Sequence, residues 1–319
     1  MNNYQSLPIE RRSVIDVGTN SVKVLVADLK GGDVIPVEER AIQTRLGDGF
    51  HNGNELQKHS IEKTVDAIKK FVLLSKSLGA SRIRIIATSA VREGINSNKL
   101  KQIVREKLGL EMEIISGERE AELVFEGIVD HISDASNERI LIADIGGGSS
   151  EFIYGIGKRI EFVRSYPFGT VKYLNSCRVS DPPLESEYLH CRKRINDDLS
   201  NSIVNDLKNL VSFVGKGIDK FIATGGTITI LGRIVLHNDE FIRERLENLK
   251  INYEEIKNIC DNLWTLPLKD RETIQGIPPD RADVILFGAL MYEVIMKNLC
   301  LDSVYVSTKG LRFGAIKKN

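Results

Sequence analysis

Two segments of the chain alternate apolar and polar residues in the way that predicts a β-hairpin. In the first, Val14 to Val17 and Val22 to Ala27 are apolar except for Asp16 and Lys23, and four polar or glycine residues, Gly18 to Ser21, separate them. The second hairpin is predicted at Ile140 to Tyr154, around the glycine run Gly146 to Gly148. Strands of this kind need a sheet, so each hairpin predicts the start of a larger β structure.

The remaining pattern alternates helices with single strands. Apolar residues at helical spacing predict helices at Ser60–Leu78, at Ser97–Leu108, from near Ser116, at about Leu184–Val214, after Gly226 and at Leu286–Leu299. Short β-branched runs predict strands at about Val34–Val37, Arg82–Ala87, Met112–Ile115, Lys220–Ala223 and Ser303–Ser307, the last followed by a glycine-rich turn. This alternation indicates the α/β class.

The two hairpins repeat one sequence pattern. When Ile15–Ser21 is aligned with Ala143–Ser149, an aspartate, a glycine and a serine recur in register, at an offset of 128 residues. Because both copies lie at the turn of an apolar hairpin, the repeat predicts two similar lobes. We expect an N-terminal lobe at 1–124, completed by 308–319, and a C-terminal lobe at 125–307.

The repeated turns have the composition of phosphate-binding loops. Glycine allows several backbone N–H groups to point the same way and adds no side chain to block an anion. The candidate phosphate ligands are Gly18, Thr19, Asn20 and Ser21 in the first turn, and Gly146, Gly147, Gly148 and Ser149 in the second. The alternative is that each turn is a tight hairpin whose aspartate caps its own backbone.

Acidic and basic residues next to these turns suggest metal and phosphate chemistry. Asp16 and Asp144 end apolar strands and need polar partners, which a Mg²⁺ ion shared across a cleft would supply. Two residues beyond the shared serine, the first copy has Lys23 and the second has Glu151. If the hairpins face each other, one lobe offers a cation to phosphate and the other a carboxylate to metal or water.

A third glycine turn, Gly225–Gly226, follows an apolar strand and precedes a helix. Backbone donors and a helix N-terminus then coincide, which favours an anion or nucleotide. An ordinary strand-to-helix turn explains the same residues equally well.

Composition excludes several classes of function. The 44 basic residues equal the 44 acidic ones, so no net field favours nucleic acid or an anionic membrane. No run of 18 apolar residues occurs, and a cytoplasmic protein is the simplest expectation. The four cysteines are scattered without a C-x-x-C, so neither a disulfide scaffold nor a zinc ribbon is indicated, and His190–Cys191 is expected on a helix surface rather than at a metal.

Five sequence blocks together resemble the exopolyphosphatase and guanosine pentaphosphate phosphohydrolase family. They are Ile15–Ser21, Ala87–Arg92, Ser116–Leu123, Asp144–Glu151 and Ala223–Thr227, and they extend in order through Arg281–Asp283. The chain ends soon after Gly314, as in the short two-domain form of the family. The resemblance implies the actin-like ATPase, sugar kinase and Hsp70 fold, which is ribonuclease H-like, with two similar lobes and an interdomain cleft.

The resemblance also implies roles for single residues. Glu120 matches the catalytic glutamate that acts as general base, and Glu151 matches a second acidic position that orients water or holds Mg²⁺, together with Asp144 and Asp16. Arg92 resembles the arginine that neutralises phosphate, and Lys23 and Arg281 resemble basic positions that contact the anionic substrate; Lys309 is a weaker candidate.

Simpler interpretations of the two glutamates remain open. Acidic residues favour any helix N-terminus, which explains Glu118 better than Glu120, and Glu151 would otherwise be a solvated residue on a strand edge. Many relatives have two adjacent glutamates where this chain has Arg119 before Glu120, so the role of the first is lost or altered here.

The expected activity is hydrolysis of a terminal phosphoanhydride, with Mg²⁺ as cofactor. Inorganic polyphosphate and guanosine pentaphosphate or tetraphosphate are the expected small-molecule partners, with polyphosphate slightly favoured, and a homodimer is suggested by the family alone. Two rivals remain: an ATP-dependent sugar or acid kinase on the same fold, and a non-catalytic regulator that senses an alarmone.

Overall fold

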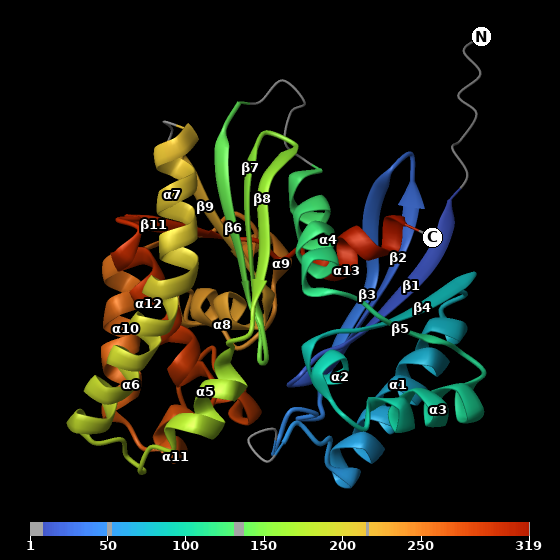
Figure 1. Cartoon of the computed structure of the whole chain (residues 1–319). Coiled ribbons are helices and arrows are strands. Elements are labelled where there is room, and N and C mark those ends of the chain that lie inside the picture. The colour runs from blue at the N-terminus through green and yellow to red at the C-terminus, as the bar shows by residue number, and fades with distance from the viewer. Residues whose placement is uncertain (1–8, 50–52, 131–136, 215–216, 319) are drawn as a thin grey trace. The chain divides into compact units, whose positions relative to one another are not determined.

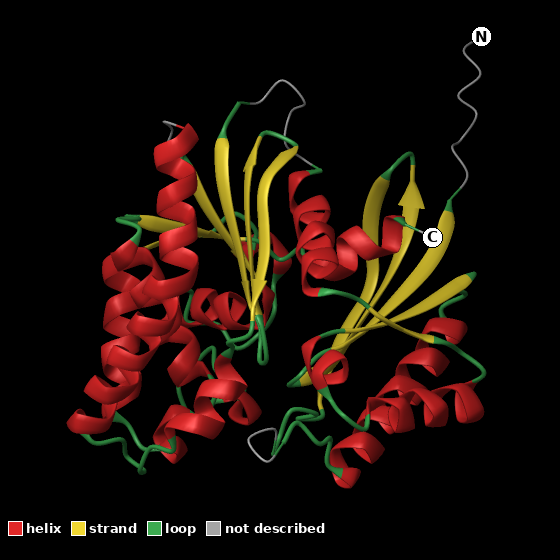
Figure 2. Cartoon of the chain, viewed as in Figure 1, coloured by secondary structure: helices red, strands yellow, loops and turns green. Residues whose placement is uncertain are grey.

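The computed structural model describes residues 9–49, 53–130, 137–214 and 217–318. The chain forms two compact units, one of residues Met1–Gly127 with Leu311–Asn319 and one of residues Ile128–Gly310. We call these unit 1 and unit 2 and describe each by itself. Each unit has its own sheet with helices packed on it (Figures 1 and 2). The expected division lies after residues 124 and 307, and these units divide after residues 127 and 310.

Unit 1 contains a five-stranded mixed sheet of order β3-β2-β1-β4-β5. The strands are β1 (Glu10–Val17), β2 (Ser21–Lys30), β3 (Asp33–Gln43), β4 (Arg82–Ala87) and β5 (Met112–Ile114). β1 to β3 form an antiparallel meander, and β4 and β5 continue from β1 in parallel. The predicted first hairpin is therefore confirmed, and the third strand, predicted at Val34 to Val37 and the residues after them, spans Asp33–Gln43.

Helices cover both faces of this sheet. They are α1 (Lys58–Ser77), α2 (Ser89–Glu93), α3 (Ser97–Leu108), α4 (Gly117–Val129) and α13 (Leu311–Lys317). One core joins α1 and α3 to the strand residues that include Ile15, Val17 and Val24. Because side chains alternate along a strand, Asp16 points to the opposite face, on which α13 packs. The last helix of the chain thus completes its first unit.

Unit 2 repeats the strand arrangement with one strand added. Its sheet has the order β10-β11-β9-β6-β7-β8. The strands are β6 (Arg139–Ile145), β7 (Ser150–Ile156), β8 (Arg159–Tyr166), β9 (Lys220–Thr224), β10 (Lys250–Asn252) and β11 (Ser303–Val306). From β8 to β11 the order and directions match β3 to β5 of unit 1. The duplicated α/β lobes predicted from the repeat are confirmed.

The helices of unit 2 surround a single large core. They are α5 (Thr170–Cys177), α6 (Glu185–Leu199), α7 (Asn205–Val214), α8 (Gly225–Val235), α9 (Arg243–Leu246), α10 (Tyr253–Thr265), α11 (Leu268–Arg271) and α12 (Ile285–Asn298). A π-helical turn at Ser200–Val204 joins α6 to α7. α12 is apolar around most of its circumference and is buried from Ile285 to Met296, which makes it the centre of the core.

Some elements were not predicted. β8 carries Arg159, Glu161 and Arg164, and its apolar residues are mostly half-buried, so its alternation is weak. α5 and α13 have eight and seven residues, which is too short for a clear helical period. After β11 the sequence analysis predicts only a glycine-rich turn, whereas the structure continues from that turn into helix α13.

Candidate active site

The β1–β2 turn of unit 1 is closed by a backbone hydrogen bond from the Gly18 N–H to the Ser21 carbonyl at 3.0 Å. Thr19, Asn20 and Ser21 are all buried. The segment after β3 supports the turn, because amides of residues 44, 45 and 47 donate to the carbonyls of Thr19 and Asn20. A Cβ on Gly47 would collide with the Thr19 side chain, so this support needs glycine.

Several polar atoms around this turn are buried without a hydrogen bond. Among the described residues they include Asp16 Oδ1, both amide atoms of Asn20 and Thr44 Oγ1. A buried polar atom without a partner costs about 1–3 kcal/mol, so proteins seldom keep several together. The cluster indicates a place where an absent polar group would complete the bonding.

Opposing effects act on the Asp16 carboxyl. Burial raises its pKa, and the positive charges of Lys23 and Arg312 oppose the rise. Lys23 lies directly across the β1–β2 ladder from Asp16. Arg312 comes from α13, where it donates to the Val24 carbonyl at 2.8 Å and pairs with Glu39. Sequence reasoning missed Arg312, because nothing in the local sequence indicates that α13 returns to β2.

Glu120 and Arg92 are in direct contact. Arg92 Nη1 lies 3.2 Å from Glu120 Oε2 and donates to the Ile115 carbonyl at 2.9 Å. The short helix α2 presents Arg92 just after β4, and Glu120 lies in the first turn of α4, just after β5. The structure thus brings together the predicted base and the predicted phosphate-neutralising arginine, and the ion pair orients the buried carboxylate.

The neighbours of Glu120 differ from it in burial. Glu118 is exposed, whereas Glu120 is only 8% exposed. Arg119 pairs with Glu122 at 2.6 Å and with Glu126 at 3.8 Å along α4. Helix N-terminal preference therefore explains Glu118 but does not explain why Glu120 is buried against an arginine.

The β6–β7 turn of unit 2 has the same closure as its counterpart. The Gly146 N–H donates to the Ser149 carbonyl at 3.0 Å. Here the support comes from the start of α5, because the Thr170 amide donates to Gly146 and the Val171 amide to Gly147. Gly148 and Ser149 are buried, and a Cβ on Gly169 would collide with the Gly147 backbone. Both predicted phosphate turns are therefore closed by the same backbone hydrogen bond.

Asp144 and Glu151 occupy opposite positions in the β6–β7 ladder. Glu151 is 1% exposed and accepts a 2.7 Å hydrogen bond from Ser165 Oγ on β8. β7 is paired on both sides, so the alternative of a solvated residue on a strand edge is wrong. Two carboxylates on neighbouring strands suit Mg²⁺, which is commonly held by one or two carboxylates plus substrate phosphates.

The third glycine turn lies against Asp144. Gly225 has φ +91° and begins α8, and a Cβ there would collide with Asp144 Oδ1. A Cβ on Gly226 would lie 3.1 Å from Arg281 Nη2, so the guanidinium packs over this glycine. In unit 2 the predicted residues Asp144, Gly225, Gly226 and Arg281 are therefore neighbours. Lys309 is adjacent, since its carbonyl accepts a hydrogen bond from Thr224 Oγ1.

A protein-family model described as the Ppx/GppA phosphatase family matches residues 25–319 of this chain. The chain belongs to the Ppx/GppA phosphatase family. Its relatives include exopolyphosphatase 1 of Mycobacterium tuberculosis, strain H37Rv, which is 28% identical over 307 residues, or 96% of this chain and 87% of that protein.

Two solved structures extend the comparison. The Aquifex aeolicus Ppx/GppA family member is 28% identical, with a TM-score of 0.78 and 97% of both chains covered. An exopolyphosphatase from Cytophaga hutchinsonii is 25% identical, with a TM-score of 0.85 and 96% of both chains covered. The predicted family and the predicted α/β fold of two similar lobes are thereby confirmed.

The match to the Ppx/GppA family does not by itself assign the metal ligands. Among the described residues, no group of three or more histidine, cysteine or acidic side chains is arranged to hold an ion. Asp16 belongs to unit 1 and Asp144 to unit 2, so a shared Mg²⁺ ion stays a prediction. Unit 2 by itself provides one pair of candidate metal-binding carboxylates, Asp144 and Glu151. His190 is exposed, as expected for a helix surface, whereas the same expectation for Cys191 is wrong, because Cys191 is buried in the core.

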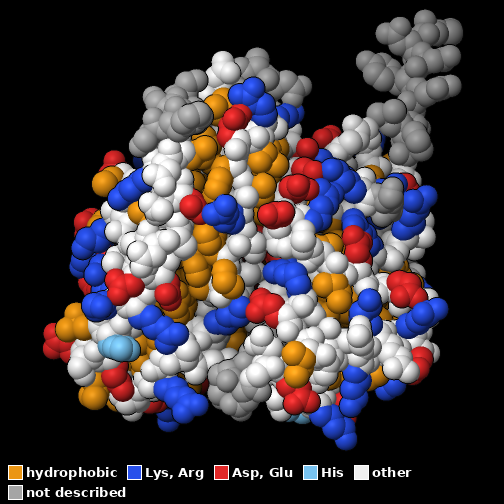
Figure 3. Space-filling view, viewed as in Figure 1, with side chains coloured by type: hydrophobic (Ala, Val, Ile, Leu, Met, Phe, Trp, Pro, Cys, Tyr) orange, Lys and Arg blue, Asp and Glu red, His pale blue; other side chains and the backbone are white. Residues whose placement is uncertain are grey.

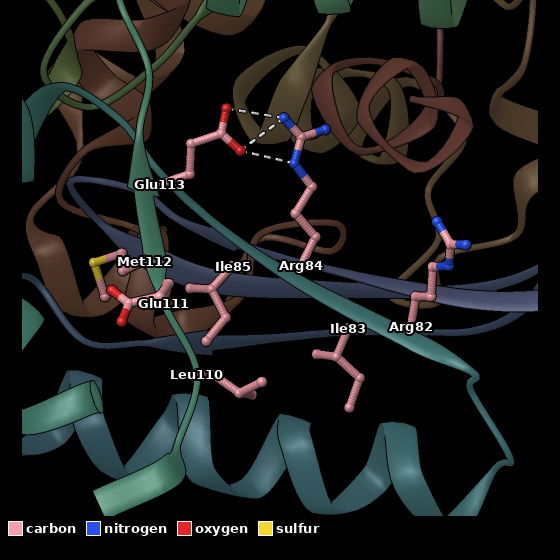
Figure 4. A pocket seen from close by; sticks show the side chains of 8 residues that line it. All are labelled: Arg82, Ile83, Arg84, Ile85, Leu110, Glu111, Met112 and Glu113. Atoms are coloured by element: carbon pink, nitrogen blue, oxygen red, sulfur yellow. Dashed lines mark hydrogen bonds and ion pairs between the residues drawn. The ribbon is translucent and has the colours of Figure 1, made fainter. Parts of the chain in front are cut away.

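A surface pocket of unit 1 lies away from these residues. It is lined by Arg82 to Ile85 of β4 and by Leu110 to Glu113 (Figure 4). The Arg84 guanidinium binds the Glu113 carboxylate at its edge, as Figure 4 shows. None of the predicted Ppx/GppA site residues lines this pocket, so we do not assign the chemistry to it.

Two further features agree with the composition. None of the helices in the described part of the chain has the length and apolar character needed to cross a membrane. On the face drawn in Figure 3, basic and acidic side chains are interspersed. This distribution agrees with the balanced charge of the sequence.

Proposed function

We propose that this protein hydrolyses the terminal phosphoanhydride of inorganic polyphosphate and releases orthophosphate. The observation that carries the proposal is the Arg92–Glu120 pair, a buried carboxylate held by a guanidinium in the unit that also contains the Gly18–Ser21 turn. Curated relatives named exopolyphosphatase support the choice of polyphosphate. Guanosine pentaphosphate presents the same kind of terminal bond and is the second substrate to test.

The chain's own residues would divide the reaction between them. Water attacks the terminal phosphorus, the bridging P–O bond breaks, and the shortened chain leaves. Glu120 would take the proton of the attacking water, and Arg92 would turn donors toward the phosphoryl oxygens while it holds that carboxylate. Backbone N–H groups of the Gly18–Ser21 turn, which belongs to the same unit as Glu120 and Arg92, would bind phosphates of the substrate.

Mg²⁺ would be held by Asp144 and Glu151, with Asp16 as a further candidate. When bound, the ion would neutralise charge on the phosphates. The unsatisfied Asp16 Oδ1 fits the need for an additional polar group near the first turn. Arg281, packed over Gly226, would offer its guanidinium to the anionic substrate.

The decisive experiment measures orthophosphate release from polyphosphate and from guanosine pentaphosphate, with Mg²⁺ present or chelated. Loss of a general base typically lowers the rate about 10²- to 10⁴-fold, so we expect that loss for Glu120→Gln. Glu118→Gln is the matched control, because Glu118 lies in the same helical turn but is exposed. We expect it to keep wild-type activity.

The assay also separates the alternative functions. A kinase would need an acceptor to turn over, and a regulator would bind these compounds without releasing phosphate from them. Equal activity of Glu120→Gln and wild type would refute the assignment of the base. Release from neither substrate by the wild-type protein with Mg²⁺ would refute the proposed activity itself.

A further inference from the structure

Basic side chains are concentrated on two neighbouring helices of unit 1. α1 and α3 contact each other and pack against the same core of the unit (Figure 1). Their basic residues are Lys58, Lys63, Lys69, Lys70 and Lys76 on α1, and Lys99, Lys101, Arg105 and Lys107 on α3. All of them are exposed except Lys101, which is half-buried. We call these nine side chains the basic face.

The charge of these helices departs from the balance of the whole chain. α1 has five lysines against Glu62 and Asp66, and α3 has three lysines and one arginine against Glu106, so each helix has a net charge of +3. Because the whole chain is neutral, the rest of it has a net charge of −6. Among the described residues, Arg105 pairs with Glu111 at 3.1 Å, and none of the eight lysines forms an ion pair. The basic face is therefore a local excess of positive charge.

α1 points its N-terminal end toward the edge of the sheet that has the Gly18–Ser21 turn. The helix leads into β4, which is parallel to β1, and Ser75 near its end shares a 2.7 Å hydrogen bond with Ser13 near the start of β1. Helix and strand therefore run in opposite directions. Eleven helical residues back from Ser75 and five strand residues on from Ser13 both span about 16 Å, which sets Thr64 level with Gly18.

α3 begins beside the start of α1. The side chain of Asn96, the residue before α3, exchanges two 2.9 Å hydrogen bonds with the backbone of Leu56, just before α1. Lys58 and Lys99 are thus the lysines nearest the turn, and Lys76 lies at the far end of α1. A helix of this length spans about 30 Å. The basic face therefore extends away from the candidate site of unit 1.

We propose that the basic face binds the distal part of a long polyphosphate chain whose terminal phosphate occupies the candidate site. The inference rests on the proposed function, because it takes inorganic polyphosphate as the substrate. A terminal phosphoanhydride is far too small to cover a helix about 30 Å long, whereas a chain of many phosphates can follow it. Many weak contacts along one chain then add to the affinity of the terminal group.

The side chains of the basic face suit polyphosphate better than nucleic acid. Single-stranded nucleic acids are commonly held by aromatic side chains on which the bases stack. Phe71 is the only phenylalanine, tyrosine or tryptophan of α1 and is buried, and α3 has none. Lysine acts as a point charge without a fixed bonding geometry, which matches a flexible chain of phosphates without bases.

The first test measures binding of end-labelled long-chain polyphosphate to the full-length protein, with Mg²⁺ chelated to prevent turnover. One variant combines Lys69→Gln, Lys70→Gln and Lys76→Gln, since glutamine has nearly the helix propensity of lysine. We expect its Kd to rise about tenfold. The slope of log affinity against log salt concentration should become shallower by about 2, because each phosphate contact contributes about 0.7.

Two further triple variants complete this test. Lys99→Gln with Lys101→Gln and Lys107→Gln changes α3 instead, so the result does not depend on one variant folding, and we expect the same loss of affinity. The matched control replaces Lys208, Lys250 and Lys269, three exposed lysines of unit 2, by glutamine. It removes the same charge and should bind long-chain polyphosphate as the wild type does. An equal loss in this control would overturn the proposal, because net charge alone would then explain the binding.

The second test measures orthophosphate release with Mg²⁺ present, from long-chain polyphosphate and from tripolyphosphate. We expect the two helix variants to raise KM for the long chain about tenfold and to leave kcat and the hydrolysis of tripolyphosphate unchanged. Unchanged KM and Kd for the long chain, in variants that still hydrolyse tripolyphosphate, would refute the basic face and leave the proposed function intact. Release from neither substrate by the wild type would instead refute the proposed function, whatever the binding assay gives.

A competition experiment separates polyphosphate from nucleic acid. Single-stranded RNA with the same number of phosphates should displace the labelled polyphosphate only weakly. RNA that binds as tightly as polyphosphate, and loses the same affinity in both helix variants, would assign the basic face to nucleic acid and overturn the proposal.

Discussion

At the scale of single residues, acidic side chains that look alike in the sequence differ in how deeply they are buried. Glu118 and Glu120 are two residues apart in one helical turn, yet Glu120 is buried against Arg92 and Glu118 is exposed. Glu151 is buried with a hydrogen bond from Ser165, whereas Asp16 keeps one buried oxygen without a partner among the described residues. A carboxylate buried at such a cost indicates a functional site more strongly than its position in a motif does.

Asp16 predicts an unusual dependence of stability on pH. Its folded pKa is raised above the ordinary 3.8, so its contribution favours folding below pH 3.8 and is lost as pH rises through the folded pKa. At neutral pH the raised pKa of Asp16 therefore costs stability. We expect Asp16→Asn to raise the free energy of unfolding at pH 7–8 by on the order of 1 kcal/mol, with the gain shrinking toward pH 3, as measured by urea unfolding.

Asp28 provides a control of opposite sign. Its hydrogen-bonded pair with Arg11 lowers its pKa, so its contribution is present above pH 3.8 and is lost as pH falls through the folded pKa. Asp28→Asn should therefore lower stability at neutral pH, by less than about 1 kcal/mol because the pair is partly exposed. Destabilisation by both variants at pH 7 would contradict our interpretation of Asp16.

The hydrogen bonds of Arg92 predict that lysine cannot replace this arginine without loss of activity. Its Nη1 lies within bonding distance of both Glu120 and the Ile115 carbonyl, and its planar fork has further donors for phosphate. Arg92→Lys keeps the charge but not this geometry, so phosphate release should fall by about tenfold or more. The matched control is Arg119→Lys on α4, where Arg119 pairs with Glu122, and its activity should not change. Equal activity of both variants would remove Arg92 from the proposed site.

At the scale of elements, each glycine turn is held by the segment that follows the third strand of its antiparallel meander, β3 in unit 1 and β8 in unit 2. Residues 44–47 support the first turn, and the start of α5 supports the second. The β9–α8 connection adds Gly225, which leaves room for the Asp144 carboxylate. In unit 2 the position of the Asp144 side chain therefore depends on the backbone of the β9–α8 connection at Gly225.

Gly225→Ala tests this coupling. The new Cβ combines a strained φ of +91° with a collision against Asp144, so we expect a loss of about 2–4 kcal/mol in the free energy of unfolding. Gly32→Ala is the matched control, because Gly32 has φ +98° and a Cβ there would have no atom within 4 Å. It should cost only about 1 kcal/mol from backbone strain. Similar losses in denaturant unfolding would show that contact with Asp144 is unimportant.

At the scale of the whole molecule, the chain returns to complete its first unit. Leu311, Phe313 and Ile316 of α13 are buried, and its terminal carbonyls accept hydrogen bonds from Arg12 and Arg84. A Cβ on Gly314 would collide with the Leu123 carbonyl of α4. The stability of unit 1 therefore depends on residues that follow all of unit 2 in sequence.

Phe313→Ala should destabilise unit 1 selectively. Removal of a buried phenylalanine costs about 3–5 kcal/mol. In limited proteolysis we expect cleavage within residues 9–127 to accelerate before cleavage within unit 2, whereas Lys318→Ala, at an exposed position, should leave both rates unchanged. Faster cleavage confined to unit 2 would contradict the assignment of α13.

The sequence by itself determined the α/β class, the two similar lobes and the residues of both glycine turns. These follow from local alternation and from a repeat at fixed spacing, which are readable because neighbouring residues in a hairpin are also neighbours in the chain. It also singled out Asp144 and Glu151 from the repeat, and Glu120 and Arg92 by resemblance, while their roles stay predictions.

Only the tertiary structure decided which of these residues meet. The Arg92–Glu120 pair, the contact of Asp144 with Gly225 and the effect of Arg312 on Asp16 join segments that are distant in the chain. Such contacts result from core packing and burial, and those depend on the whole fold rather than on any local pattern.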